Sequence, residues 1–372
     1  MRVAVDTRWI NPKSRSGIHT YTLRLIEALT SFILSKDLYL AATSENEIYL
    51  RSKFPNVKTL KACRAQQNWF LKKVSIFQSL GPDINLNGLI KNENIDCLIV
   101  PQINERSYIP EIEGCNVLGI LHDTQQLSLE KRIYKRRLDK ILLGRNLKRV
   151  TKVVAISQAT KKELLNSFLN IENKVEVIPN YIPFSDLSHV NEIVSGPYIL
   201  SVSAMEPYKN IYGLISAFSL VAEIVPHKLI IKSNRNTYWE NVLLPLVKNL
   251  QLETRIILIS EILSEDEMAS LYSGADLYVT LSKMEGFGYT AVEAALREVP
   301  VLASDIAAVR EATKGTSVYL DPCNTNAAAG KIILMIEEKV TRSDKLSRIS
   351  DLLKREYSVE SYSERLMRVI LT

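Results

Sequence analysis

The stretch GADLYVTLSKMEGFGYTAVEA, residues 274–294, sets an apolar run, a short turn and an amphipathic segment in immediate succession. Within it, DLYVTLS (276–282) has the β-branched and aromatic residues of a buried strand. The segment YTAVEAALREV (289–299) spaces its apolar residues as a helix does, and PVLASD (300–305) is typical of a second strand. Because strand, helix and strand in this order form the unit of a parallel sheet, the stretch predicts an α/β fold.

The same alternation extends outward from this stretch in both directions. The other predicted strands are RVAVD (2–6), CLIV (97–100), VLGILHD (117–123), VVAIS (153–157), VEVIP (175–179), YILSVSA (198–204), KLIIK (228–232) and RIILIS (255–260). Helices are predicted at 18–33 and 210–225, and the weakly hydrophobic residues 186–197 are typical of a linker. We therefore expect two doubly wound, Rossmann-like domains, with a ligand site in the cleft between them.

Composition excludes several classes of protein and of site. Of 372 residues, 46% are hydrophobic and 24% charged, as in folded globular chains. The net charge, 47 Lys and Arg against 41 Asp and Glu, is +6, which is too small to favour nucleic acid as a partner. The four cysteines lack zinc-ligand spacing, the first residues lack a signal-peptide pattern, and no apolar run is long enough to span a membrane. We expect a cytoplasmic protein without a metal site.

The turn between the predicted strand 276–282 and the next helix holds most of the candidate site residues. It contains Glu285, Gly286, Phe287 and Gly288, and Glu293 follows in the helix. The two glycines would let backbone N–H groups approach an anion at a helix N-terminus. Glu285 and Glu293 lie about 12 Å apart along a helix axis, which suits two carboxylates that hold different hydroxyls of one extended ligand. The alternative is an ordinary turn whose acidic residue stabilises the helix dipole.

Three further candidates lie at junctions of predicted strands and helices. Lys209 is placed to reach a phosphate at a helix N-terminus, and a solvated first-turn lysine is the alternative. Gly17 lies in a candidate phosphate loop that lacks the GxGxxG pattern of dinucleotide sites. His122 stands at the carboxyl end of a strand, where α/β active sites form, although lone histidines also serve structural roles.

Residues 130–149, EKRIYKRRLDKILLGRNLKR, form a strongly basic predicted helix with apolar residues at helical spacing. Such a segment suits peripheral contact with anionic lipid. The alternative is a solvated helix face.

Together these segments resemble the retaining glycosyltransferases of family 4, which have the GT-B fold. GADLYVTLSKMEGFGYTAVEA (274–294) resembles the family's E-x7-E region, and YILSVSAMEPYKN (198–210) resembles its phosphate loop. Further similar segments follow in the family's order: SGIHTY (16–21), HD (122–123), VVAISQATKKEL (153–164) and VIPN (177–180). The resemblance implies an acceptor-binding domain over 1–185, a nucleotide-sugar-binding domain over 186–355, and a terminal helix over 356–372 that returns to the first domain.

The resemblance also implies roles for the candidate residues. Glu285 would contact the hydroxyls of the donor sugar, beside the backbone N–H groups of Gly286, Phe287 and Gly288. Glu293 would hold the ribose hydroxyls of the nucleotide. Lys209 would neutralise the diphosphate, and Gly17 would let a loop close on it. His122 would line the sugar site.

Some positions depart from the family's pattern. Ser203 and Tyr208 stand where many members carry arginines near the diphosphate, so charge neutralisation depends more on Lys209. Glu298 replaces a glycine that is common before the next strand, and Thr290 replaces a frequent proline.

The function that the resemblance implies is the metal-independent, retaining transfer of a hexose from a nucleoside-diphosphate sugar, without a cofactor. The favoured donor is GDP-mannose, because Glu206-Pro-Tyr-Lys-Asn210 resembles mannosyltransferase-like members. The expected acceptor is a glycan or lipid-linked precursor of a surface polysaccharide such as lipopolysaccharide. Two other functions stay open: a sugar-nucleotide 2-epimerase, and a weakly active sugar-nucleotide-binding subunit of an assembly complex.

Overall fold

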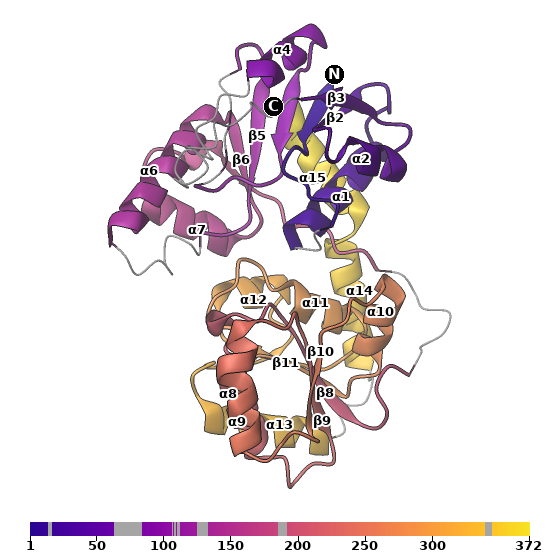
Figure 1. The fold of residues 1–372 in the computed structure, drawn as a ribbon, viewed down its shortest axis with the longest axis vertical. Coiled ribbons are helices and arrows are strands. Elements are labelled where there is room, and N and C mark those ends of the chain that lie inside the picture. Colours follow the sequence, from indigo (N-terminus) through magenta and orange to yellow (C-terminus); the bar gives the residue numbers. More distant parts are fainter. Residues whose placement is uncertain are drawn as a thin grey trace. The chain divides into compact units, whose positions relative to one another are not determined.

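A computed structural model of the chain describes residues 1–13, 17–62, 84–105, 107, 109, 112–124, 133–184, 192–338 and 344–372. Its contacts divide the chain into two units (Figure 1). Unit 1 consists of Met1–Tyr181 together with Val359–Thr372, and unit 2 is Ile182–Ser358. The expected boundary between residues 185 and 186, and the start of the expected linker, fall in 185–191, which lie outside the described residues.

Unit 1 is built on a parallel sheet in the order β3-β2-β1-β4-β5-β6-β7. The strands are β1 (Val3–Asp6), β2 (Leu38–Ala42), β3 (Lys58–Lys61), β4 (Cys97–Val100), β5 (Asn116–Leu121), β6 (Lys152–Ala155) and β7 (Val175–Val177). All residues of β1, β2 and β4 are buried, as expected of strands that helices cover on both faces.

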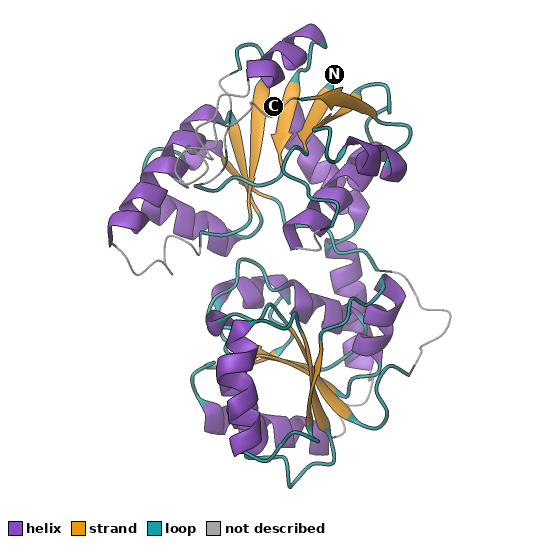
Figure 2. Cartoon of the chain, in the orientation of Figure 1, coloured by secondary structure: helices purple, strands orange, loops and turns teal. Residues whose placement is uncertain are grey.

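The helices of unit 1 lie on both faces of this sheet (Figure 2). They are α1 (Gly17–Thr30), α2 (Glu47–Lys53), α4 (Ile84–Asn92), α6 (Ile133–Arg149), α7 (Gln158–Ser167) and α15 (Val359–Leu371), with a 3₁₀ turn at Glu172–Lys174. Apolar side chains of α4, α6 and α7 pack on one face, Leu143 and Leu147 among them. On α1 and α15, the buried hydroxyls of Tyr21 and Tyr362 hydrogen-bond at 2.8 Å, which ties the last helix into unit 1.

Unit 2 has a second parallel sheet, in the order β10-β9-β8-β11-β12-β13. Its strands are β8 (Tyr198–Val202), β9 (Lys228–Lys232), β10 (Ile256–Ile259), β11 (Leu277–Thr280), β12 (Val301–Ser304) and β13 (Val318–Leu320). Its helices are α8 (Ile211–Ser219), α9 (Leu244–Asn249), α10 (Glu265–Ser273), α11 (Tyr289–Leu296), α12 (Ala307–Ala312), α13 (Thr325–Glu337) and α14 (Asp344–Glu356), with a 3₁₀ turn at Pro207–Lys209 and a π-helical turn at Trp239–Leu243.

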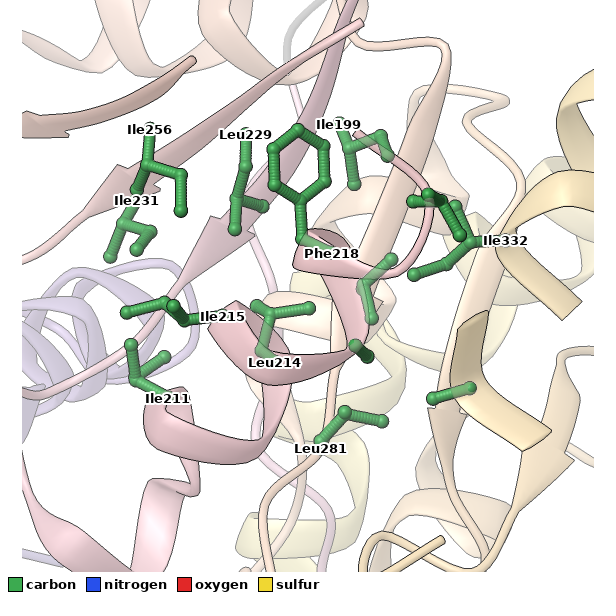
Figure 3. Packing of buried hydrophobic residues seen from close by; sticks show 14 of the residues in the cluster. Ile199, Ile211, Leu214, Ile215, Phe218, Leu229, Ile231, Ile256, Leu281 and Ile332 are labelled. Carbon is green, nitrogen blue, oxygen red and sulfur yellow. The ribbon is translucent and has the colours of Figure 1, made fainter. Parts of the chain in front are cut away.

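One face of the unit 2 sheet carries a large apolar core. Figure 3 shows Phe218 and Ile215 of α8 directed at Leu229 and Ile231 of β9, and α9 and α13 complete this layer. On the opposite face, the ring of Tyr278 on β11 lies 5.9 Å from that of Tyr272 on α10. Successive residues of a strand point to opposite faces of the sheet. Because both faces are covered, residues on both faces are buried, which accounts for the continuous apolar runs in the sequence.

The predicted fold class is therefore confirmed: both units are doubly wound, parallel α/β domains. Within the described residues, no helix is both long enough and apolar enough to cross a membrane.

Candidate functional site

The order of the unit 2 strands reverses between β8 and β11. From β8 the chain runs outward through β9 and β10, and it then returns to place β11 on the other side of β8. Doubly wound sheets bind their ligands at such a point, beyond the carboxyl ends of the strands. The loops that follow β8 and β11, residues 203–210 and 281–288, flank this point and contain Lys209 and Glu285.

The loop after β8 is shaped by its own sequence. Pro207 opens the 3₁₀ turn Pro207–Lys209, where a fixed φ is favourable. Asn210 then adopts a left-handed conformation (φ 55°, ψ 37°), which asparagine tolerates better than most residues, and α8 begins directly after it. The buried amide of Asn210 donates to the carbonyl of Pro322 at 2.8 Å, so the loop is anchored at the position next to Lys209.

The two loops contact each other through backbone and side chain. The N–H of Lys283 donates to the carbonyl of Tyr208 at 2.8 Å. Lys209 Nζ donates to Glu285 Oε1 at 2.7 Å, with the two side chains only 13% and 15% exposed. Sequence reasoning gave Lys209 and Glu285 separate ligand contacts, and the structure adds that they are partners across 76 positions of sequence.

Phe287 and Gly288 fix the end of the loop after β11. Phe287 is buried, with its ring 4.9 Å from that of Tyr289 and 5.4 Å from that of Tyr357. Gly288 caps α11 at φ 113° and ψ 39°, a conformation that side chains disfavour. A buried anchor and a glycine cap therefore set the direction in which α11 leaves the loop.

We expect Gly288→Ala to destabilise unit 2 by about 1–3 kcal/mol, because it imposes backbone strain at a positive φ. The new Cβ would also lie only 3.2 Å from Cγ2 of Val309. Thermal unfolding followed by circular dichroism measures this effect. Gly330→Ala is the matched control, since a Cβ there meets nothing within 4 Å and alanine favours the helix. Equal stability of the two variants would contradict the strain.

Glu293 lies on α11 and has a buried hydroxyl as partner. Tyr272 of α10 donates to Glu293 Oε2 at 2.8 Å. Burial and the charge of Glu293 raise the pKa of Tyr272 well above its ordinary value, so its hydroxyl stays protonated and donates. Sequence reasoning missed Tyr272, whose only signal was an aromatic residue in the helix that precedes β11.

Two further hydroxyls lie at the same edge of the sheet. Ser203 and Ser233 follow the paired ends of β8 and β9, and the N–H of Ser203 donates to the carbonyl of Lys232. Among the described residues, the buried oxygens of Ser203 and Ser233 have no hydrogen-bond partner. Burial lowers the pKa of Lys232 between them. This edge therefore has hydrogen-bonding capacity beyond the predicted residues.

Gly17 and His122 belong to unit 1. Gly17 begins α1, and a Cβ there would meet nothing within 4 Å, so packing against the described residues does not require glycine. His122 Nε2 lies 2.9 Å from the carbonyl of Pro101, and the ring meets that of Tyr21 edge-on at 4.4 Å.

The surroundings of His122 also fix its protonation. Burial lowers its pKa to about 4, so the ring is neutral at pH 7. A carbonyl only accepts, so Nε2 carries the proton and Nδ1 is left as an acceptor.

The structure thus brings Lys209, Glu285, Phe287, Gly288 and Glu293 into unit 2 and leaves Gly17 and His122 in unit 1. Gly286 lies in the same unit 2 turn. Over the described ranges, no group of three or more His, Cys, Asp or Glu side chains is arranged to hold a metal ion.

Comparison with known proteins matches this part of the chain to a family. Residues 186–350 match the model of the glycosyl transferases group 1 family. The O-antigen chain mannosyltransferase RfbU of Salmonella typhimurium is 28% identical over 202 residues, 54% of this chain and 56% of that protein. The O-antigen chain mannosyltransferase B of Escherichia coli is 27% identical over 199 residues, 50% of this chain and 51% of that protein. The chain therefore matches about half the length of these relatives.

Solved structures match nearly the whole chain. A glycosyltransferase from Rickettsia africae has a TM-score of 0.72 at 18% identity, covering 99% of this chain and 97% of its own. Anabaena Alr3699/HepE, in complex with UDP and glucose, has a TM-score of 0.73 at 15% identity, covering 100% and 99%. The fold that they share with this chain is GT-B. Over residues 186–350, which carry Lys209, Glu285 and Glu293, this chain is similar to the glycosyl transferases group 1 family.

Proposed function

We propose that this chain transfers a sugar from a nucleoside-diphosphate donor to a glycan or lipid-linked acceptor. The observation that carries the proposal is the partly buried contact of Lys209 with Glu285 at the switch point of unit 2, inside the segment that matches the family. A cation and a carboxylate held side by side there suit a ligand with a phosphate end and a hydroxyl-rich end.

The chemical task is to stabilise negative charge on the departing diphosphate. Lys209 supplies a full positive charge, and the N-termini of α8 and α11 supply backbone N–H groups and the positive ends of their dipoles. These groups need no metal, so the proposed reaction is metal-independent and uses no cofactor. Tyr208, at a position where many members of the family carry arginine, leaves Lys209 as the main cation of its loop.

The carboxylates have distinct roles in the proposal. When the donor is bound, Lys209 contacts the diphosphate instead of Glu285. Glu285 is then able to accept hydrogen bonds from the hydroxyls of the donor sugar. Glu293, which Tyr272 holds in place, binds the ribose hydroxyls. In unit 1, Gly17 leaves room for the diphosphate, and His122 lines the sugar site with a neutral ring.

We further propose retention at the anomeric carbon, with GDP-mannose as the donor and a surface-polysaccharide intermediate as the acceptor. Two relatives named as O-antigen chain mannosyltransferases, and the sequence Glu206-Pro-Tyr-Lys-Asn210, support mannose and the acceptor class. NMR of the product's anomeric proton tests retention.

The donor is tested by thermal unfolding in the presence of GDP-mannose, UDP-glucose, ADP-glucose and dTDP-glucose. A ligand at about 100 times its Kd adds about 2.7 kcal/mol to stability. We expect GDP-mannose to raise the unfolding temperature most. A larger rise in the unfolding temperature with another sugar nucleotide would overturn the assignment of GDP-mannose as the donor. No rise with any of the four would overturn the proposal that the donor is a nucleoside-diphosphate sugar. Incubation with donor alone is the chemical control, because formation of an epimer would contradict transfer.

A further inference from the structure

The net positive charge of this chain is concentrated in one helix, α6. The 17 residues of α6 include seven Lys and Arg and one Asp, a net charge of +6. The rest of the chain then has 40 Lys and Arg against 40 Asp and Glu, so α6 accounts for the whole net charge of +6. Since its single acid, Asp139, is buried, the outward side of the helix is basic.

The same helix exposes large apolar side chains. Ile133 is 62% exposed, and Tyr134 and Ile141 are each 68% exposed. Ile133, Arg137 and Ile141 follow one another at four-residue spacing, so they share one side of the helix. Together with Tyr134 and Leu138 they line a surface pocket. We call the exposed set the α6 face: Ile133, Tyr134, Arg136, Arg137, Lys140, Ile141 and Lys148.

The inner side of α6 is firmly attached to unit 1. Leu143 and Leu147 belong to the apolar core between the sheet of unit 1 and the helices on that face. Arg149 donates to the carbonyl of Ile109 at 2.9 Å, and Asn146 donates to those of Asn104 and Ser107 at 2.8 Å each. The helix is therefore anchored to unit 1 by its inner side, and its exposed side chains are the basic and apolar ones of the α6 face.

We infer that the α6 face docks unit 1 on an anionic lipid bilayer, with Ile133, Tyr134 and Ile141 entering the interface and the cations contacting headgroups. A helix with apolar and basic residues on one exposed side has the chemistry of an interfacial helix. A second copy of the chain is a poor occupant, because two faces of the same positive charge repel each other. A nucleic acid would use the cations and leave the three apolar side chains in water.

This inference is independent of the sugar that the chain transfers, and it deepens one element of the proposed function. A lipid-linked acceptor lies in a membrane, so docking of unit 1 would bring the enzyme to the surface where that acceptor is held. Failure of lipid binding and failure of sugar transfer are measured separately.

The test is flotation of the full chain with two kinds of vesicle: phosphatidylcholine alone, and equimolar phosphatidylcholine and phosphatidylglycerol. We expect binding to the anionic vesicles only, and less of it at high salt. Replacing three cations, R136Q/R137Q/K140Q, should weaken partition about a hundredfold, at about 1 kcal/mol for each charge near the surface. The matched control is K345Q/R348Q/R355Q, which removes three exposed cations from α14 in unit 2 and should float as the unmodified chain does.

A second variant separates insertion from charge attraction. I133S/I141S keeps all the cations and should also bind the anionic vesicles more weakly. The inference is overturned if the α6 and α14 charge variants bind the anionic vesicles equally well. It is also overturned if I133S/I141S binds them as the unmodified chain does, because that result is expected of a site for a soluble polyanion such as RNA. Circular dichroism and donor-induced thermal shifts confirm that each variant is folded, since none of the altered residues belongs to the proposed donor site.

Discussion

Replacing Glu285 with glutamine is expected to reduce sugar transfer by about a hundredfold to a thousandfold, the cost of removing one preorganised polar group from an active site. In the proposed reaction its carboxylate holds the donor sugar while charge develops on the diphosphate. Glutamine keeps the size of the side chain and one oxygen for Lys209, so the loop after β11 should stay folded. The measurement is the initial rate of product formation at saturating donor.

Glu265→Gln serves as the control for this experiment. Glu265 is an exposed acid in the first turn of α10, outside the proposed site, and its loss should leave the rate unchanged. Full activity of the Glu285 variant would remove the central assignment. A proportionate loss of helical signal in circular dichroism would instead locate the effect in folding.

Replacing Lys209 with methionine is expected to weaken binding of the donor's diphosphate about tenfold to a hundredfold. A hydrogen bond from a charged donor contributes about 1.5–3 kcal/mol. Methionine retains the apolar length of the side chain, so packing against Tyr208, whose ring centroid lies 5.1 Å from Nζ, is largely kept. Calorimetry with GDP and with guanosine isolates the effect, because only GDP has the diphosphate.

The variant should therefore lose most of its preference for GDP over guanosine. Lys248→Met, which removes an exposed cation from α9, is the control and should keep this preference. An unchanged affinity for GDP in the Lys209 variant would show that the diphosphate is neutralised elsewhere.

The two-domain fold could be predicted because its central strands are continuous apolar runs. The runs at 97–100, 228–232 and 276–282 correspond to β4, β9 and β11. Some predicted strands were longer than the observed ones. The strand predicted at 153–157 includes Ser157, which in the structure caps α7 by accepting a hydrogen bond from the N–H of Thr160. The strand β3 was not predicted, because its sequence KTLK has only one buried residue.

The candidate site was predictable as positions and not as contacts. Order along the chain placed Lys209 and Glu285 in loops at strand ends. Their pairing depends on β8 and β11 being neighbours, which sequence spacing does not give. The link from Tyr272 to Glu293 was missed for the same reason, since it joins two helices through packing.

One departure from the family's pattern has a backbone explanation. Glu298 stands where a glycine is common, and it adopts φ 59°, a left-handed conformation that glycine accepts more readily. The sequence identified the position as unusual, and the structure gives it a backbone conformation that favours glycine.

The place of α15 has a consequence for synthesis on the ribosome. Unit 1 contains both Met1–Tyr181 and Val359–Thr372, whereas unit 2 is one continuous segment. All of unit 2 is therefore translated before the hydroxyl of Tyr21 can meet that of Tyr362. Although domains generally fold from the N-terminus first during synthesis, the N-terminal unit here is the one completed last. Until then, the residues of α1 that α15 contacts stay uncovered.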